Sequence, residues 1–384
     1  MRILVIAGGP FPMGRGTPAR TLRVSEALVA RGHDVCVAAF PLADPHIETK
    51  LHIERSEGFR GYRKTSPGPS WAKLFAMSPR LAARVQELLE QRSFDVIYAH
   101  HYEGLLVASI ARRRSGVRVP IVFDSHTLLG SELGYYFPRF LRTPVAWLGA
   151  ILDGRLLRLA DAIICVTDEI TNFYAARAKP DLPTITAASG VEIEKFARVS
   201  APRHDAASVR VVFAGNLSGY QGFDLLLAAF RRIRQKRRDI ELVVSSPEAE
   251  SVLSALGVDD PHAQGIRVRS ASFRDLPEIL AAADIAANPR IVGAGMPQKL
   301  LNYMASGLPT VSFEGSATIL VHEKTGLVVP DGDIDAFAAA ITRLADARQL
   351  RLQLGNAARA LVEAEYKWER VAVIFERVCD RLLR

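Results

Sequence analysis

The sequence predicts an α/β protein with two doubly wound, Rossmann-like parallel sheets, and three observations support this fold class. Short apolar runs alternate with amphipathic helical stretches over most of the 384 residues, as expected for parallel sheets covered by helices on both faces. The alternation breaks over the charged segment 191–207 and then restarts. Hydrophobic residues make up 49% of the chain, which is enough to fill two cores.

The first half of the chain is expected to form one sheet. Thr17 is the expected N-cap of a helix that has Pro18 in its first turn and ends at Gly32, the usual punctuation of a helix. Further helices are expected at 103–114 and from Asp168. The expected strands span 2–7, 34–40, 95–101, 120–126, 162–167 and 184–188.

The second half repeats the pattern. Helices are expected at 222–237, 276–283 and 297–306, and a last helix at 367–383 is expected to return to the first domain. The expected strands span 209–214, 240–245, 266–270, 285–288, 309–313 and 327–330. We therefore predict an N-terminal domain over 1–198, a C-terminal domain over 199–364 and a return helix within 365–384. In such sheets ligands bind at the carboxyl ends of the strands, so we expect a cleft where the two domains face each other.

A Gly-rich loop that opens the helix after Pro297 is the most informative local feature. The free N–H groups at a helix N-terminus, together with the helix dipole, bind phosphate. Lys299 lies in the first turn of this helix and adds a cation. Gly16 and Thr17 begin another helix, which provides a second expected phosphate-binding terminus. The ordinary alternative is that Gly16 is a turn residue and Thr17 only a cap.

Composition and charge limit the classes of partner. The net charge of +8 favours an anionic ligand such as a nucleotide or a phospholipid headgroup, and the sequence has no nucleic-acid-binding motif. The three scattered cysteines are expected to be buried free thiols, with neither a disulfide nor a metal site. No window is long and apolar enough for a membrane span, and the first residues are expected to form a strand, not a signal peptide. These features predict a cytoplasmic protein.

Six segments occur in a recognisable order along nearly the whole chain. They are GRGTPARTLRVSEALVARGHDVCVAA (14–39), SGVEIEKF (189–196), VVFAGNLSGYQGFDLLLAAF (211–230), FRDLPEILAAADIAANP (273–289), KLLNYMASGLPTVS with KTGLVVPDGD (299–312 and 324–333) and YKWERVAVIFERV (366–378). In this order they resemble the motifs of the family-4 glycosyltransferases, which have the GT-B fold. The resemblance implies transfer of a sugar from a nucleotide-diphosphate donor to a hydroxyl group of a glycan or a lipid-linked acceptor, with retention of configuration.

The resemblance also implies roles for individual residues. It places His126, Lys299 and Arg290 in catalysis, where cations and hydrogen-bond donors stabilise the departing diphosphate. His100 and His101 are the expected acceptor-side residues. The expected donor-binding residues are Gly16, Thr17, Asn216, Gln221, Ser272, Phe273, Gly295, Met296 and Asn302. No metal and no cofactor are expected besides the nucleotide-diphosphate sugar as co-substrate.

The chain departs from the family pattern at four positions, three of them among these residues. Two glutamates of the family are replaced by Ala294 and Asn302, and an arginine and a lysine that normally hold the diphosphate are replaced by Asn216 and Gln221. Lys299 and Arg290 are predicted to replace the lost cations. Two alternatives follow from these losses: a non-catalytic relative that binds nucleotide-sugar or partners another transferase, and a nucleotide-sugar 2-epimerase-like enzyme.

Residues 136–160 combine aromatic and aliphatic side chains with four arginines. A basic amphipathic segment of this kind can lie on an anionic membrane surface, so peripheral contact with the inner membrane face is predicted. The alternative is that the apolar side chains pack onto the first domain and the arginines are solvated.

Overall fold

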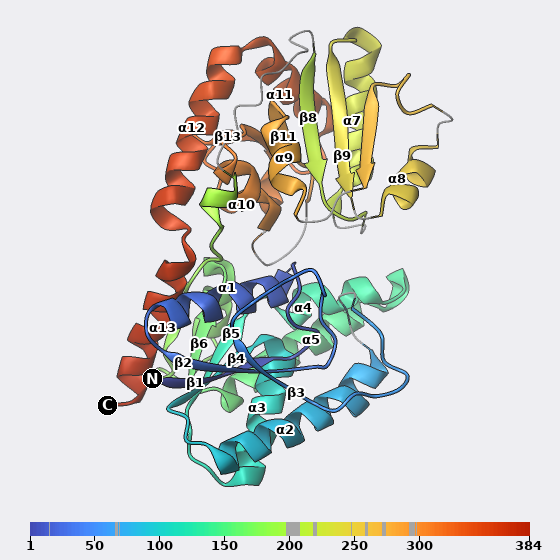
Figure 1. Ribbon diagram of the computed structural model, residues 1–384. Helices are drawn as coiled ribbons and strands as arrows, with labels where there is room; N and C mark the ends of the chain where they lie inside the picture. The colour runs from blue at the N-terminus through green and yellow to red at the C-terminus, as the bar shows by residue number, and fades with distance from the viewer. Residues whose placement is uncertain are drawn as a thin grey trace. The chain divides into compact units, whose positions relative to one another are not determined.

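The computed structural model forms two compact units (Figure 1). It describes residues 1–14, 16–65, 68, 70–196, 208–217, 221–246, 248–257, 260–270, 274–291, 296 and 298–384. Unit 1 contains Met296 and the described residues of 1–190 and 368–384, and unit 2 contains those of 191–291 and 298–367. The chain thus changes unit after Gly190, ahead of the predicted boundary at residue 198.

Unit 1 is built on a parallel seven-stranded sheet in the order β3-β2-β1-β4-β5-β6-β7. The strand order reverses between β1 and β4, and this is the switch point at which open α/β sheets bind ligands. The strands are β1 (Arg2–Ala7), β2 (Asp34–Ala39), β3 (His52–Arg55), β4 (Val96–His100), β5 (Ile121–Ser125), β6 (Ala162–Cys165) and β7 (Thr184–Thr186).

Helices cover both faces of this sheet. The C-terminal α13 belongs to unit 1. Its apolar side chains Val371, Phe375 and Val378 recur at helical spacing. They are buried in the same core as side chains of β1 and α1. The helices are α1 (Gly16–Ala30), α2 (Ser78–Gln91), α3 (His101–Ser115), α4 (Leu129–Glu132), α5 (Arg142–Leu156), α6 (Asp168–Ala175) and α13 (Trp368–Leu382), with a π-helical turn η1 (Lys73–Met77) before α2.

Unit 2 repeats the design with a parallel six-stranded sheet in the order β10-β9-β8-β11-β12-β13. Its strands are β8 (Val209–Ala214), β9 (Ile240–Ser246), β10 (Ile266–Ser270), β11 (Ile285–Asn288), β12 (Thr310–Phe313) and β13 (Gly326–Val329). Its helices are α7 (Phe223–Lys236), α8 (Ala249–Leu256), α9 (Leu276–Ala281), α10 (Gln298–Ala305), α11 (Ile334–Asp346) and α12 (Arg348–Glu365). None of the described helices of either unit is long and apolar enough to cross a membrane.

The predicted fold class is confirmed, and two local expectations are wrong. Helix α1 begins at Gly16, so Thr17 lies inside its first turn and its carbonyl accepts a hydrogen bond from Thr21. Strand β4 ends at His100, and His101 starts α3 with a left-handed φ of 62°. The two adjacent histidines therefore lie on different elements, whereas the expected strand 95–101 contained both. The sequence analysis also missed the edge strand β3 and the helices α2, α4, α5, α8, α11 and α12.

Candidate active site

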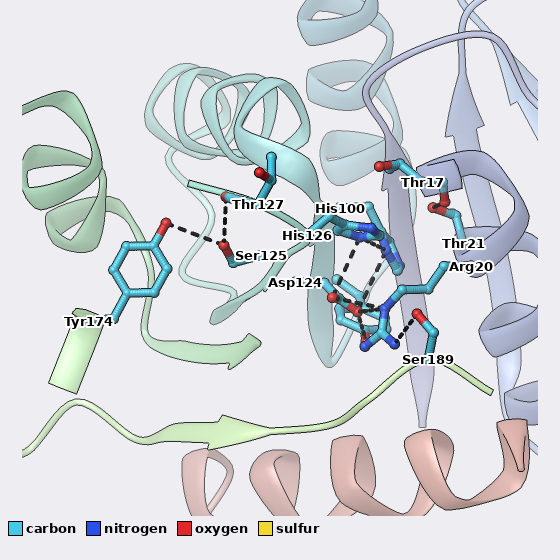
Figure 2. Close-up of polar contacts among 11 residues, drawn as sticks. Thr17, Arg20, Thr21, His100, Asp124, Ser125, His126, Thr127, Tyr174 and Ser189 are labelled. Atoms are coloured by element: carbon cyan, nitrogen blue, oxygen red, sulfur yellow. Dashed lines mark hydrogen bonds and ion pairs between the residues drawn. The ribbon is translucent and has the colours of Figure 1, made fainter. Parts of the chain in front are cut away.

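A polar cluster lies at the carboxyl ends of β4 and β5, next to the switch point of unit 1. Asp124 is paired in register with His100 on the neighbouring strand, and His126 follows the end of β5. Arg20 reaches the same place from α1, and Ser189 from the segment after β7 (Figure 2). Side chains from four separate segments thus converge at the edge where this fold binds ligands.

The carboxylate of Asp124 is the centre of the cluster and is fully buried. Arg20 Nε donates to its Oδ1 at 3.1 Å, and the Tyr98 hydroxyl donates a short hydrogen bond to Oδ2. Burial alone would raise the pKa of Asp124, but Arg20 and the two neighbouring histidines hold this pKa at about 2. The carboxylate is therefore ionised, and it fixes the positions of the groups around it.

The two histidines of the cluster are neutral near neutral pH. His100 Nδ1 lies 3.2 Å from His126 Nε2, and His126 Nε2 lies 3.5 Å from Asp124 Oδ1. Burial lowers the pKa of His100 to about 4 and the pKa of His126 well below its usual value, although Asp124 opposes both shifts. His100 is 0% exposed, so the acceptor-side contact expected from the sequence is not available to its ring in this structure.

Three residues of this cluster are of the types that bind metal ions. One atom each from His100, Asp124 and His126 lie within 4.8 Å of one another. However, Arg20 binds the same carboxylate through a charge-assisted hydrogen bond, and its guanidinium cannot lose its proton in a protein. A divalent cation would therefore face a fixed positive charge, and we interpret the cluster as a hydrogen-bonded network.

A second ion-pair chain lies beside this cluster in unit 1. Lys73 Nζ donates to Glu103 Oε1 at 2.5 Å, and Glu103 also accepts a short hydrogen bond from His101 Nδ1. Burial opposes ionisation of Glu103, but His101 and Lys73 hold its pKa at about 2. The ring of His101 lies 6.1 Å from that of His126, so the predicted acceptor-side residue His101 is adjacent to the cluster.

In unit 2, Lys299 lies in the first turn of α10 and is partly buried. Its Nζ donates to Gln221 Oε1 at 2.6 Å and lies 4.5 Å from the centre of the Phe213 ring. Burial lowers the pKa of Lys299 to about 7, and the positive charge of Arg290 adds to this effect. Among the described residues no carboxylate forms an ion pair with Lys299. The structure thus brings together three predicted donor-site residues, Lys299, Gln221 and Arg290.

Asn302 lies on a buried face of α10. The residue is 3% exposed, between the buried Leu301 and Tyr303, and its Oδ1 is buried without a partner in the described part of the chain. Buried carbonyl oxygens of this kind are normally hydrogen-bonded. The contact of Asn302 with a ribose stays a prediction. Its Oδ1 is a buried acceptor without a partner in the described part of the chain.

The structure describes some of the remaining predicted site residues and leaves others out. Gly16 is exposed at the start of α1, and Thr17, Asn216 and Met296 are partly exposed, so all four can meet a ligand. Gly222, next to Gln221, has a left-handed φ of 67°, and an added Cβ would collide with the Pro289 carbonyl. This packing fixes the loop that carries Gln221 against the one that carries Arg290. Ser272, Phe273, Gly295 and Ala294 lie outside the described residues.

Arg20 and Tyr98 are site residues that the sequence analysis missed. A usable signal was present for Arg20, which stands at helical spacing with Val24, Ala27 and Leu28, all of them buried. A cation on the apolar stripe of a helix needs a buried counter-charge, and Asp124 provides it. Tyr98 gave no such signal, because a tyrosine in an apolar strand is usually a core residue.

Comparison with known proteins agrees with this architecture. Two parallel sheets with these strand orders are typical of the GT-B class. Solved structures superpose on the whole chain. Sucrose-phosphate synthase from Thermosynechococcus elongatus superposes with a TM-score of 0.81 at 18% identity over 99% of this chain and 98% of that one. Anabaena HepE, in complex with UDP and glucose, superposes with a TM-score of 0.74 at 16% identity over 99% of both chains.

Family models and curated relatives narrow the class further. The model of the "Glycosyl transferase 4-like domain" matches residues 15–186, and that of "Glycosyl transferases group 1" matches 208–347. The chain is 25% identical to the GDP-mannose-dependent alpha-(1-6)-phosphatidylinositol monomannoside mannosyltransferase of Mycolicibacterium smegmatis, over 95% of each chain. It is 26% identical to the GDP-mannose-dependent monoacylated alpha-(1-6)-phosphatidylinositol monomannoside mannosyltransferase of Corynebacterium glutamicum, over 76% of this chain and 78% of that one.

The chain belongs to the family-4 glycosyltransferases and has the GT-B fold. It is a glycosyltransferase that depends on a nucleotide-sugar donor. Of the three classes that the sequence left open, the comparisons support the transferase, because the matched relatives are hexosyltransferases.

Proposed function

We propose that the protein transfers a hexose, with retention of configuration, from a guanosine diphosphate sugar to a hydroxyl group of a lipid-linked acceptor. The donor class and the lipid acceptor are taken from the names of the mannosyltransferases to which the chain is similar. In this proposal Lys299 and Arg290 bind the diphosphate of the donor, and His126 has the contact with the sugar that the family resemblance implies. The departing phosphate takes the proton of the acceptor hydroxyl, so no separate general base is required.

The pairing of Lys299 with Gln221 is the observation that carries the donor site. A partly buried cation whose hydrogen-bond acceptor is a neutral amide is stabilised when an anion binds beside it. The diphosphate of a donor sugar is such an anion, and the N-terminus of α10 adds its dipole to the attraction. Asn216 and Gln221 then contribute neutral hydrogen bonds, while Lys299 and Arg290 contribute the charge that stabilises the leaving group.

Turnover of a panel of nucleotide sugars tests this proposal. We would incubate the protein with uridine, guanosine, adenosine and thymidine diphosphate sugars, follow binding by thermal shift, and follow turnover by nucleotide release. GDP-mannose is expected to give the highest turnover. Lys299→Ala should lower kcat/KM by roughly 10- to 150-fold, because a charge-assisted hydrogen bond is worth about 1.5–3 kcal/mol.

Lys324→Ala is the matched control, because Lys324 is an exposed lysine of the same unit and its loss should leave kcat/KM unchanged. The absence of binding to every donor would overturn the proposed function. Binding and turnover that survive in Lys299→Ala would remove Lys299 from the site but leave the transferase in place.

An exposed apolar segment of unit 1 favours an acceptor at a membrane surface. Within the predicted segment 136–160, Phe140 is 80% and Trp147 69% exposed, and the arginines at 139, 142, 155 and 158 are exposed as well. Large exposed aromatic side chains are uncommon on monomeric proteins and often mark interaction sites. Together with the arginines they suit an anionic lipid headgroup region.

Sedimentation with lipid vesicles tests this part. Vesicles of phosphatidylglycerol and phosphatidylcholine should retain the protein at low salt, and the double variant Phe140→Ser/Trp147→Ser should lose most of this retention. Phe59→Ser is the control, since Phe59 is 42% exposed and lies outside the segment. If anionic vesicles fail to retain the unsubstituted protein at low salt, the membrane contact is wrong, whatever the outcome of the donor panel.

A further inference from the structure

His100 is a polar side chain that is too deeply buried to contact a ligand directly. It is the last residue of β4, its side chain is 0% exposed, and the ring is enclosed by Tyr98 at 4.3 Å and His126 at 5.5 Å between ring centres. An apolar residue would fill this position at lower cost, because a buried polar ring must find hydrogen-bond partners. The question is therefore what its nitrogen atoms do.

The contact between the two histidines requires one shared hydrogen. His100 Nδ1 and His126 Nε2 are 3.2 Å apart, so one of these nitrogens donates and the other accepts. Each neutral imidazole carries a single hydrogen, and its two nitrogens have opposite roles. The position of the shared hydrogen therefore also determines which of the two ring nitrogens of His126 carries a hydrogen toward the substrate.

The far nitrogen of His100 distinguishes the two arrangements. His100 Nε2 is buried and has no hydrogen-bond partner among the described residues. If His126 donated, His100 would have to carry its own hydrogen on Nε2, which would leave a buried N–H without an acceptor. Orphaned buried N–H groups are rarer than under-satisfied acceptors. The favoured arrangement places the shared hydrogen on His100 Nδ1.

We propose that His100 is a positioning residue that donates its Nδ1 hydrogen to His126 Nε2 and thereby holds His126 as the tautomer protonated at Nδ1. This inference rests on the proposed function, in which His126 acts on the donor sugar. In this tautomer His126 is a hydrogen-bond donor toward an oxygen of the substrate through Nδ1, and Nε2 is engaged by His100. His126 then stabilises developing negative charge and does not act as a proton acceptor.

The surrounding charges support a neutral pair. Asp124 lies on one side of the two rings, 3.7 Å from His100 Nδ1 and 3.5 Å from His126 Nε2, and it is neutralised by Arg20 and hydrogen-bonded by Tyr98. His101 adds a further titratable ring 6.1 Å from His126. Burial outweighs the attraction of Asp124 and keeps the pKa of both rings of the pair low. The tautomer is therefore the property that His100 can control near neutral pH.

Two variants separate positioning from packing. His100→Phe retains a ring of similar size without a nitrogen and should lower kcat at least tenfold, while the KM for the donor changes less than twofold. His100→Asn places an amide nitrogen near the position of Nδ1 and should recover most of the lost kcat. A structural role alone would give the opposite order, because the smaller asparagine leaves a cavity.

Nitrogen-15 spectroscopy of the histidine rings tests the tautomer directly. In the full-length protein labelled on its nine histidines, the His126 signals, assigned by their loss in His126→Asn, should show a protonated Nδ1 and a bare Nε2 at pH 7. In His100→Phe this preference should be lost, whereas His100→Asn should keep it. A wild-type His126 protonated at Nε2 would overturn the proposal, as would a tautomer and a kcat that are both unchanged in His100→Phe. The spectrum is informative without turnover, so it can fail or succeed independently of the proposed function.

Discussion

The polar clusters of the two units differ in whether their own residues supply a counter-charge to the cation. In unit 1, Arg20 and Asp124 pair with each other, and Tyr98 and the two histidines complete a buried network. In unit 2, the partly buried ammonium of Lys299 has a neutral acceptor, the Gln221 amide. A network that supplies its own ion pair holds a reacting group in place. A cation with only a neutral acceptor is prepared for an anion that arrives with the substrate.

Removing the counter-charge of Arg20 should produce the largest effect. Asp124→Asn leaves a buried guanidinium without a carboxylate, and breaking a buried ion pair from one side costs about 3–5 kcal/mol. We expect a loss of this size in the free energy of unfolding, measured by urea denaturation. Ser189→Ala is the matched control, since it removes one hydrogen bond from the Arg20 guanidinium to a neutral hydroxyl at 3.3 Å and should cost about 1.5 kcal/mol. Equal losses in both variants would show that the pair is not the centre of the network.

The pH dependence of donor binding should be large in unit 2. The pKa of Lys299 is lowered to about 7, so the free enzyme loses this cation as the pH rises above 7. The KM for the donor should then rise roughly tenfold per pH unit above 7, because only the protonated form binds the diphosphate. Steady-state kinetics between pH 6 and 9 measures this rise.

Lys299→Arg provides the control for this prediction. An arginine keeps its charge throughout this range, so the KM of the variant should be nearly independent of pH, even if it is higher overall. A KM of the unsubstituted enzyme that stays flat up to pH 9 would contradict the assigned role of Lys299 as the titrating group.

Substitution of Gln221 should have the smallest effect on donor binding, and it tests the comparison of the two units most directly. Gln221→Met removes a neutral hydrogen bond worth about 0.5–1.5 kcal/mol, so the KM for the donor should rise roughly 2- to 10-fold at pH 6.5. Gln221→Glu makes unit 2 resemble unit 1, because Lys299 then has a carboxylate partner. We expect this variant to have a higher melting temperature and weaker donor binding, since the new carboxylate competes with the diphosphate. Tighter donor binding in Gln221→Glu would refute the comparison.

Local sequence signals predicted the parallel strands well and the details of the site less well. The strands at 2–7, 209–214 and 285–288 have the predicted bounds, because a buried parallel strand is a short apolar run that can be read directly from the sequence. The missed helix α12 has only four buried residues among eighteen, so its weak apolar pattern gave no clear signal. The placement of Lys299 and Gln221 on one site was expected from the family motifs, whereas their direct hydrogen bond was not.

The sequence by itself determined the fold class, the family and the residue types of the donor site, because periodicity, turn residues and motif order are local properties of the chain. Only the tertiary structure decided that His100 is buried against His126, that Arg20 neutralises Asp124 from a position 104 residues away, and that Asn302 faces the core. These properties depend on which side chains from distant segments meet in a space that excludes water. Burial and pairing across such distances set the charge of each group, and no local pattern encodes them.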